Sequence, residues 1–274
     1  MIIARSLLSE VRFHCPDETS ARQLAYIGAD PEMPGTRLDS LEVNILDLGG
    51  GFYDFGPPHP TGPGTARHMV ERAHMYLRDR LGAEAVGAAL LHGASLIIEG
   101  RRCLVVAEKG SGKTTLMLVA LQQGLAIEAD EHVAVFPDHV LARPRTLRIK
   151  AGSLAFAAEF RERILSSPAI HDWNGNAIYS FAPRTDRVDW RIRPGPADAV
   201  VVLEPNHAGL TCVDRMSREQ AFSRLLTHAF LPSSGRAPAL GNLHRLASAA
   251  QCWKLRLGNP DRAIWHLRQI LSRS

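Results

Sequence analysis

The chain has 274 residues, 45% of them hydrophobic and 22% charged, with a formal net charge of +4. This composition excludes a disordered protein and is sufficient for a large core in one or two domains. The sequence has no block of basic residues and no aromatic series interleaved with lysine and arginine, which argues against a nucleic-acid partner.

The apolar runs and the cysteines indicate the cellular compartment in which the protein is expected. Charged residues interrupt the N-terminal apolar segment too early for a signal sequence, and no later run approaches the ~20 residues that cross a bilayer. The cysteines lie far apart and form no Cys-x-x-Cys pair, as is typical of reduced thiols. They are Cys15, Cys103, Cys212 and Cys252. We therefore expect a cytoplasmic protein without a membrane partner.

The first 56 residues carry short apolar runs separated by glycine and proline, at 7–13, 41–48 and 52–55. Such runs predict a small antiparallel sheet. Three glycines at 49–51 predict a hairpin turn. A second phosphate-binding loop is disfavoured there, because neither a helix nor a lysine follows. The segment 57–64, rich in proline and glycine, predicts a rigid linker.

A helix is predicted directly after this linker, with Thr65 as its N-cap. Apolar residues then recur at helical spacing, at Met69, Ala73, Tyr76 and Leu77. We therefore divide the chain into a β-rich N-terminal region with its linker, residues 1–64, and a larger domain, residues 65–274. The N-terminal part either contacts a substrate or packs on the core, and the sequence leaves both roles open.

The larger domain begins with a predicted phosphate-binding loop. Two apolar runs, 90–98 and 103–106, meet at Gly100 and predict a hairpin of buried strands. A helix is predicted from Thr114 to a stop at Gly124. The loop between the strand and this helix contains the candidate nucleotide-binding residues Lys109, Gly110, Ser111, Gly112, Lys113, Thr114 and Thr115.

Each residue type in this loop has a physical role. Gly110 and Gly112 allow positive φ and close backbone approach, Lys113 reaches the β- and γ-phosphates, and the Thr114 hydroxyl can bind Mg²⁺. The helix N-terminus favours anionic phosphates through its free N–H groups and dipole. The usual pattern starts with glycine, and Ala107 stands there instead. The loop predicts binding of ATP or GTP with Mg²⁺; the alternative is a solvated glycine turn with a chance lysine.

Two adjacent acids, Asp130 and Glu131, separate two apolar stretches between Gly124 and Phe136. Acids at the end of a strand beside a phosphate-binding loop are suited to holding Mg²⁺ or to accepting a hydroxyl proton. A solvated strand end is the alternative. His92, on the preceding hairpin, is a further candidate for a role in this site. The alternative is an ordinary surface or packed residue, because the chain has twelve histidines and one of them near a motif is unsurprising.

Two arginine-rich segments are candidates for contact with phosphate or an acidic peptide. In the first, residues 143–150, Leu147 and Ile149 alternate with basic residues, which equally predicts a strand with a solvated face. The second is the loop 184–193. A surface held by salt bridges explains its arginines at least as well as contact with phosphate or a peptide does. Residues 233–236 predict a mobile loop.

The rest of the chain alternates between helices and strands. Predicted helices cover 153–165, 217–226 and 260–271, and predicted strands cover 199–204 and 252–257. The helix at 217 opens with the sequence Ser-Arg-Glu-Gln, a capping box. This alternation predicts an α/β fold.

The order of these motifs resembles that of the HPr serine kinase/phosphorylase family, including its shorter relatives in peptide-modification gene clusters. The matching residues are His92-Gly93, the hairpin, the loop from Gly110 to Thr114, the helix that ends at Gly124, and Ala129-Asp130-Glu131. The family usually has two aspartates where this chain has Asp130 and Glu131. The likeness is sharp over residues 88–136.

This resemblance implies a P-loop nucleotide-binding core similar to those of HPr kinase and phosphoenolpyruvate carboxykinase. It also implies a kinase domain over residues 65–274, a possible homo-oligomer, and a serine-type hydroxyl acceptor on a peptide, protein or small molecule. The implied catalytic residues are Asp130, Glu131, His92 and Lys113, and the implied metal ligands are Thr114 and Asp130. Asp130 would take the acceptor proton, while Lys113 would neutralise the phosphates.

Three classes of function fit these observations. The favoured one is a Mg²⁺-dependent kinase, a phosphotransferase that acts on a hydroxyl group. The second is a nucleotide-binding partner that regulates another protein through binding or slow hydrolysis. The third is a nucleotide-dependent enzyme with a different group transfer on a small molecule. The first requires a catalytic Asp130, whereas the second does not.

Overall fold

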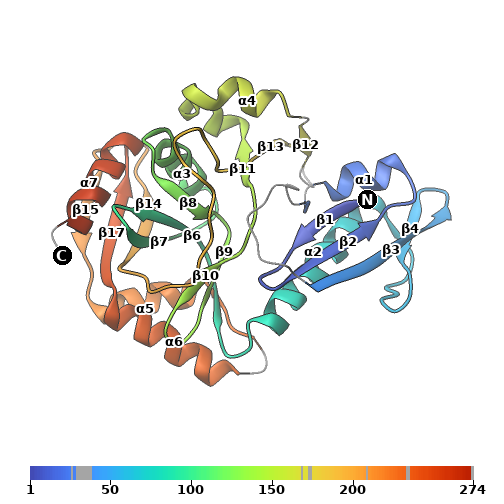
Figure 1. The fold of residues 1–274 in the computed structure, drawn as a ribbon, viewed down its shortest axis with the longest axis horizontal. Coiled ribbons are helices and arrows are strands. Elements are labelled where there is room, and N and C mark those ends of the chain that lie inside the picture. Colours follow the sequence, from blue (N-terminus) through green and yellow to red (C-terminus); the bar gives the residue numbers. More distant parts are fainter. Residues whose placement is uncertain are drawn as a thin grey trace.

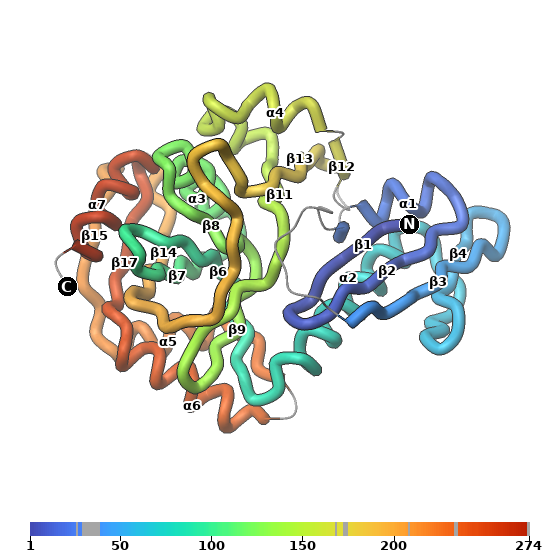
Figure 2. The backbone as a smooth tube through the Cα atoms, in the orientation of Figure 1, coloured from blue at the N-terminus to red at the C-terminus, as the bar shows by residue number. Residues whose placement is uncertain are grey.

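A computed structural model of the protein describes residues 1–25, 27–28, 39–167, 169–171, 175–207, 209–232 and 235–272. These residues form a mixed α/β fold with three sheets (Figure 1). The N-terminal sheet lies to one side of the larger body, and the two chain ends lie at opposite sides of the molecule (Figure 2). Within the described ranges, no helix is both long enough and apolar enough to cross a bilayer.

The N-terminal region forms a five-stranded sheet in the order β1-β2-β3-β4-β5. Its strands are β1 (Ile2–Arg5), β2 (Ser9–His14), β3 (Asp39–Gly49), β4 (Phe52–Phe55) and β5 (Gly64–Thr65). The predicted hairpin turn at 49–51 is confirmed, and all three glycines there have positive φ. The predicted antiparallel sheet is confirmed for the pairs β1–β2, β3–β4 and β4–β5 and is wrong for β2 and β3, which pair in parallel. A parallel pair needs a crossover, and the connection between these strands includes helix α1 (Glu18–Leu24).

Helix α2 (Ala66–Glu84) covers this sheet and has the predicted Thr65 as its N-cap. Its buried face packs with the apolar side chains of the strands, and this cluster includes Phe13, Tyr53, Phe55, Met69, Ala73 and Leu77. At the end of the helix, the Glu84 carboxylate accepts a hydrogen bond from Leu8 N (2.8 Å) and another from the Ser9 hydroxyl. The helix therefore shares a core with the N-terminal sheet, and the domain division after residue 64 stays a prediction.

The second sheet is the centre of the larger body. Seven strands follow the order β10-β9-β6-β7-β14-β17-β15, and β8 and β16 also pair with β6. The bounds are β6 (Ala89–Ile98), β7 (Arg101–Ala107), β8 (Ala126–Ala129), β9 (His132–Val135), β10 (Val140–Ala142), β14 (Ala199–Pro205), β15 (Cys212–Arg215), β16 (Ala229–Phe230) and β17 (Gln251–Leu257). The predicted β6–β7 hairpin is confirmed. Strands β7, β14 and β17 run parallel, so they end at the same edge.

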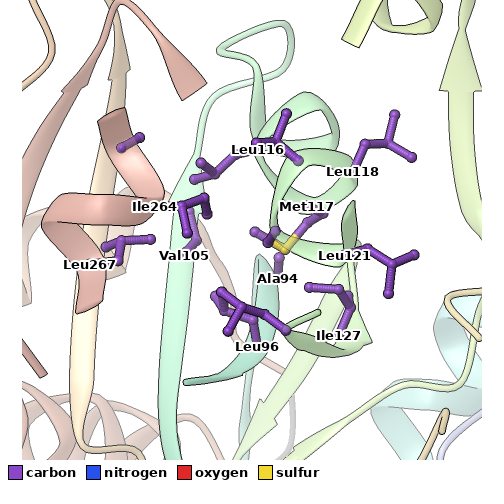
Figure 3. Packing of buried hydrophobic residues seen from close by; sticks show 14 of the residues in the cluster. Ala94, Leu96, Val105, Leu116, Met117, Leu118, Leu121, Ile127, Ile264 and Leu267 are labelled. Atoms are coloured by element: carbon purple, nitrogen blue, oxygen red, sulfur yellow. The ribbon is translucent and has the colours of Figure 1, made fainter. Parts of the chain in front are cut away.

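Helices cover both faces of this sheet. One apolar cluster holds α3 (Lys113–Gln122) and α7 (Pro260–Ser272), and the other holds α5 (Arg218–Thr227) and α6 (Arg236–Ala249). Figure 3 shows Leu116, Met117 and Leu121 of α3 packed on the strands, with Ile264 and Leu267 of α7 alongside. Full burial of one such side chain contributes roughly 1.5–3 kcal/mol. This packing fixes the start of α3 at the edge where β7 ends.

The prediction of a mobile loop at 233–236 is only partly testable. Residues 233 and 234 lie outside the described residues, whereas Arg236 begins α6. This helix was not predicted from the sequence, because Pro238, Gly241 and Asn242, all poor helix formers, obscure its pattern. Asn242 has a structural role, because its side-chain amide donates to the carbonyl oxygens of Gly87 (2.9 Å) and Val135 (3.1 Å).

A small third sheet lies over α3, in the order β11-β13-β12. Its strands are β11 (Leu147–Lys150), β13 (Ala177–Phe181) and β12 (Ile170–His171). The predicted helix 153–165 is broken into two 3-10 turns, η1 (Ala151–Phe156) and η2 (Ala158–Phe160), and a short α4 (Arg161–Leu165). The break occurs at Ala157, whose ψ of 39° is not helical.

Candidate functional site

The glycine-lysine loop, residues 108–113, joins the end of β7 to the start of α3. Gly110 and Gly112 have φ of 89° and 90°, a left-handed conformation that disfavours other residues. Ser111 N donates to Glu108 O (3.2 Å), which closes the turn. Because Gly112 is the N-cap of α3, the free N–H groups of the first helical turn lie at this loop.

Three side-chain groups converge at the start of α3. Lys113 Nζ donates to the Asp130 carbonyl oxygen (2.7 Å) and to Asp130 Oδ1 (2.8 Å). Thr114 Oγ1 donates to Asp130 Oδ2 (2.5 Å). The Lys113 and Asp130 side chains are only 9% and 6% exposed. Asp130 directly follows β8, so the strand beside β6 delivers a buried carboxylate to the helix N-terminus.

His92 lies next to this group on β6. Its backbone N–H donates to His228 O (2.8 Å), and Gly93 N donates to Glu131 O (3.0 Å). Burial, followed by the charge of Lys113, lowers the pKa of His92 to about 4. The imidazole is therefore neutral at pH 7.

Glu131 has different partners from Asp130. Its Oε2 lies 3.7 Å from Arg143 Nη1 and also contacts Arg145 Nη1. Both arginine side chains are nearly buried, at 5% and 6% exposure. The arginines at the start of the 143–150 segment thus neutralise an internal acid. In the same segment, Leu147 and Ile149 are buried, as their alternation predicted.

Two more histidines lie beside Arg143, Arg145 and Glu131, which together form the arginine cluster. Burial lowers the pKa of His132 to about 3, so its 3.6 Å approach to Glu131 is not an ion pair. His132 Nδ1 instead faces Arg143 Nη1 at 3.4 Å, where a neutral ring can accept. His74 reaches the cluster from α2, and burial, together with Arg145 and Arg143, lowers its pKa to about 4.

The other predicted loop residues are placed apart from this convergence. Lys109 is exposed. The Thr115 hydroxyl lies 3.0 Å from that of Ser153, on η1. The structure therefore brings together Lys113, Thr114 and Asp130, with His92 on β6 and Glu131 in the bend between β8 and β9.

A buried ion pair between β7 and β8 was not predicted from the sequence. Arg102 Nε donates to Glu128 Oε2 (2.8 Å), and the Ser95 hydroxyl donates to the same oxygen (2.5 Å). The predicted arginine loop is tied to this pair, because Trp190 Nε1 donates to Glu128 O (3.1 Å) and Arg102 Nη2 donates to Arg193 O (2.7 Å). The sequence held one indication of this pair, because Glu128 is the charged residue in an otherwise apolar strand.

Fold and site together define a mixed α/β protein with a glycine-lysine loop at a helix N-terminus and a carboxylate from a neighbouring strand. No protein-family model and no curated protein sequence matches the chain. Among solved structures, the HPr(Ser) kinase/phosphatase from Coxiella burnetii matches with a TM-score of 0.32 and 10% identity, over 67% of this chain and 94% of that chain. A similarity this low assigns no function.

Proposed function

We propose that this protein is a Mg²⁺-dependent kinase that transfers the γ-phosphate of ATP or GTP to a hydroxyl group, most directly a serine of a peptide or protein. One observation carries the proposal: Lys113 and Thr114, at the N-terminus of α3, both bond to the Asp130 carboxylate. A cation, a hydroxyl and a carboxylate beside free helix N–H groups are the parts that phosphoryl transfer requires.

The loop and Lys113 would bind the triphosphate. Positive φ at Gly110 and Gly112 leaves the backbone open to close approach by phosphate oxygens. The α3 N-terminus attracts anions, and Lys113 adds a full charge within a nearly dry site. Its ammonium has three donors, two of which are directed at Asp130, so a third is available to a phosphate oxygen.

The donor set suits Mg²⁺. Among the described residues, no group of three or more His, Cys, Asp and Glu side chains is arranged to hold a metal without other ligands. Mg²⁺ at nucleotide sites uses one or two protein oxygens and takes its other ligands from phosphates and water. Thr114 Oγ1 and the Asp130 carboxylate, already in contact, are such a pair. Bound there, the ion would neutralise charge on the β- and γ-phosphates.

Asp130 would also act on the acceptor. As the acceptor oxygen bonds to the γ-phosphorus and the bond to the β-phosphate oxygen breaks, the hydroxyl proton passes to the carboxylate. Neutral His92 can orient the acceptor or a phosphate oxygen without competing with Lys113 for charge. Glu131, held by Arg143 and Arg145, is assigned a positioning role, because its backbone carbonyl anchors Gly93 beside His92.

Two substitutions test this assignment. With γ-labelled ATP and an array of serine-containing peptides, Asp130→Asn should lower transfer by a factor of about 10²–10⁴. The nucleotide Kd should stay within a few-fold of wild type. Lys113→Ala should weaken both nucleotide binding and transfer. The matched control is Asp138→Asn, at a carboxylate 85% exposed, which should change neither.

The outcomes separate the function classes. Full transfer by the Asp130→Asn variant would contradict the kinase. Nucleotide binding that depends on Lys113, without transfer to any peptide, would instead support a regulatory nucleotide-binding protein. If Lys113→Ala binds nucleotide as tightly as wild type does, the proposed nucleotide-binding site is wrong.

A further inference from the structure

We propose that a groove between α7 and strand β15 binds an extended peptide segment that carries an aromatic side chain flanked by acidic residues. This groove, called the edge groove, has a volume of about 500 Å³. Its lining includes Val213, Arg215, Trp253, Trp265, His266 and Gln269. The volume is within the range of ligand-binding clefts. The proposal does not rest on the kinase assignment.

The edge groove is separate from the glycine-lysine loop. Strand β17 runs parallel to β14 and β7, and its last residue, Leu257, lies against Gly112. Gln251 and Trp253, which line the groove, lie at the opposite end of this strand. An occupant of the groove can therefore bind whether or not a nucleotide is bound.

Strand β15 offers backbone groups to an added strand. It is the last strand of its sheet in the described part of the chain, and it pairs with β17 with Arg215 opposite Trp253. Met216 N donates to Cys252 O (2.9 Å), so by alternation the N–H and C=O groups of Val213 and Arg215 point away from β17. Figure 1 places β15 at the periphery, beside α7. A free edge of this kind accepts an extended peptide through main-chain hydrogen bonds.

Two indole rings favour an aromatic side chain. Trp265 on α7 is 50% exposed, which is unusual for so large an apolar side chain. Trp253 forms the strand side of the groove, and the Arg215 guanidinium lies 5.8 Å from its ring centroid. The side chains of Val213 and Arg215 line the groove, and their backbone groups form the free edge. A strand added to β15 would therefore place alternate side chains over the groove.

Charge selects an acidic peptide. The groove lining contains the Arg215 guanidinium and, among the described residues, no carboxylate. The neighbouring acid, Asp214, is on the opposite side of β15 and is bound to Arg256 Nη2 (2.9 Å). Acidic residues two positions from the aromatic one would reach Arg215 from the same face of the added strand.

The probe that tests this proposal is the acetylated, amidated peptide Thr-Glu-Thr-Phe-Thr-Glu-Thr, whose Glu and Phe side chains share one face. Calorimetric titration should show saturable binding to the full chain without nucleotide. Trp265→Ala and Arg215→Glu should each weaken it at least about tenfold. Exchanging both Glu residues of the probe for Lys should have a similar effect. Phe156→Ala, at another exposed aromatic residue, and Lys113→Ala should leave binding unchanged.

A second variant tests the strand addition. Val213→Pro removes an outward N–H and is tolerated on an edge strand, so its circular dichroism and Tm should stay near wild type. It should abolish binding of the probe. Binding by folded Val213→Pro equal to wild type would exclude strand addition. The proposal would be overturned if Phe156→Ala weakened peptide binding as much as Trp265→Ala does. It would also be overturned if binding of the probe to the wild-type protein did not saturate up to about 1 mM peptide.

Discussion

Two adjacent acids, Asp130 and Glu131, have different partners. Asp130 bonds to Lys113 and Thr114, whereas Glu131 contacts two nearly buried arginines. The sequence identified both acids from their position after an apolar run, and it predicted the lysine and threonine from the loop pattern. The resemblance singled out Asp130 as metal ligand and proton acceptor, but the arginine partners of Glu131 were not predicted, because they come from a later segment.

The buried histidines make stability depend on pH, and His74 is the clearest case. Its pKa is lowered to about 4 by burial and by Arg145 and Arg143, so the unfolded chain binds its proton more readily than the folded one. Its contribution is complete above the unfolded pKa, near 6.5, and is lost as pH falls towards 4. When the pH falls from 7.5 to 5, the unfolding free energy should therefore decrease by about 2 kcal/mol through His74 alone.

Urea unfolding at both pH values measures this effect. His74→Gln should reduce the loss of stability at pH 5 by about that amount. His171→Gln, at an exposed histidine, is the control and should leave the loss unchanged. Identical pH profiles for wild type and His74→Gln would show that His74 is not held neutral by the fold.

Elements with strong local signals were predictable from the sequence. The β6–β7 hairpin, the α3 helix and the capping box of α5 agree with the structure because runs of neighbouring residues specify them. Parallel pairing of β2 with β3 was missed, since it depends on a crossover rather than on either strand. Helix α6 was missed because its proline, glycine and asparagine are accommodated by tertiary contacts such as those of Asn242.

The Arg102–Glu128 pair joins β7, β8 and the segment around Trp190, and its removal tests how these elements are held. Arg102→Met alone would leave a buried carboxylate without its cation and should destabilise the protein by about 3–5 kcal/mol. The double variant Arg102→Met with Glu128→Leu should recover much of that loss. Chemical unfolding of the four proteins of this cycle provides the measurement. Additive losses would show that the two groups are not coupled.

At the scale of the whole molecule, the N-terminal region is hydrogen-bonded to Arg143, which follows β10, and to Arg148 on β11. Arg143 Nε donates to Arg5 O (2.8 Å), while its Nη1 lies near Glu131. Arg148 Nη2 donates to Gly28 O (2.5 Å). The sequence left the role of this region open between substrate contact and packing. Its hydrogen bonds to Arg143 and Arg148 show that it packs on the larger body, while contact with a substrate stays a prediction.

Glu84 tests a separate contact, the attachment of helix α2 to the start of strand β2. Its side chain is 4% exposed and accepts bonds from Leu8 N and from the Ser9 hydroxyl. Glu84→Ala should lower the unfolding free energy by about 1–3 kcal/mol, because these donors lose a buried acceptor. It should also speed hydrogen exchange in β1 and β2. Glu71→Ala, at a carboxylate 46% exposed, should cost less than about 0.5 kcal/mol. Equal effects of the two substitutions would contradict this attachment.

The most direct test of the central claim is a crystal structure of the protein with Mg²⁺ and a non-hydrolysable ATP analogue. We expect the β- and γ-phosphates at the N-terminus of α3, with Lys113 Nζ within hydrogen-bonding distance of them and Asp130 facing the terminal phosphate. A nucleotide bound elsewhere, or phosphates that make no contact with Lys113 or the loop from Gly110 to Gly112, would contradict it.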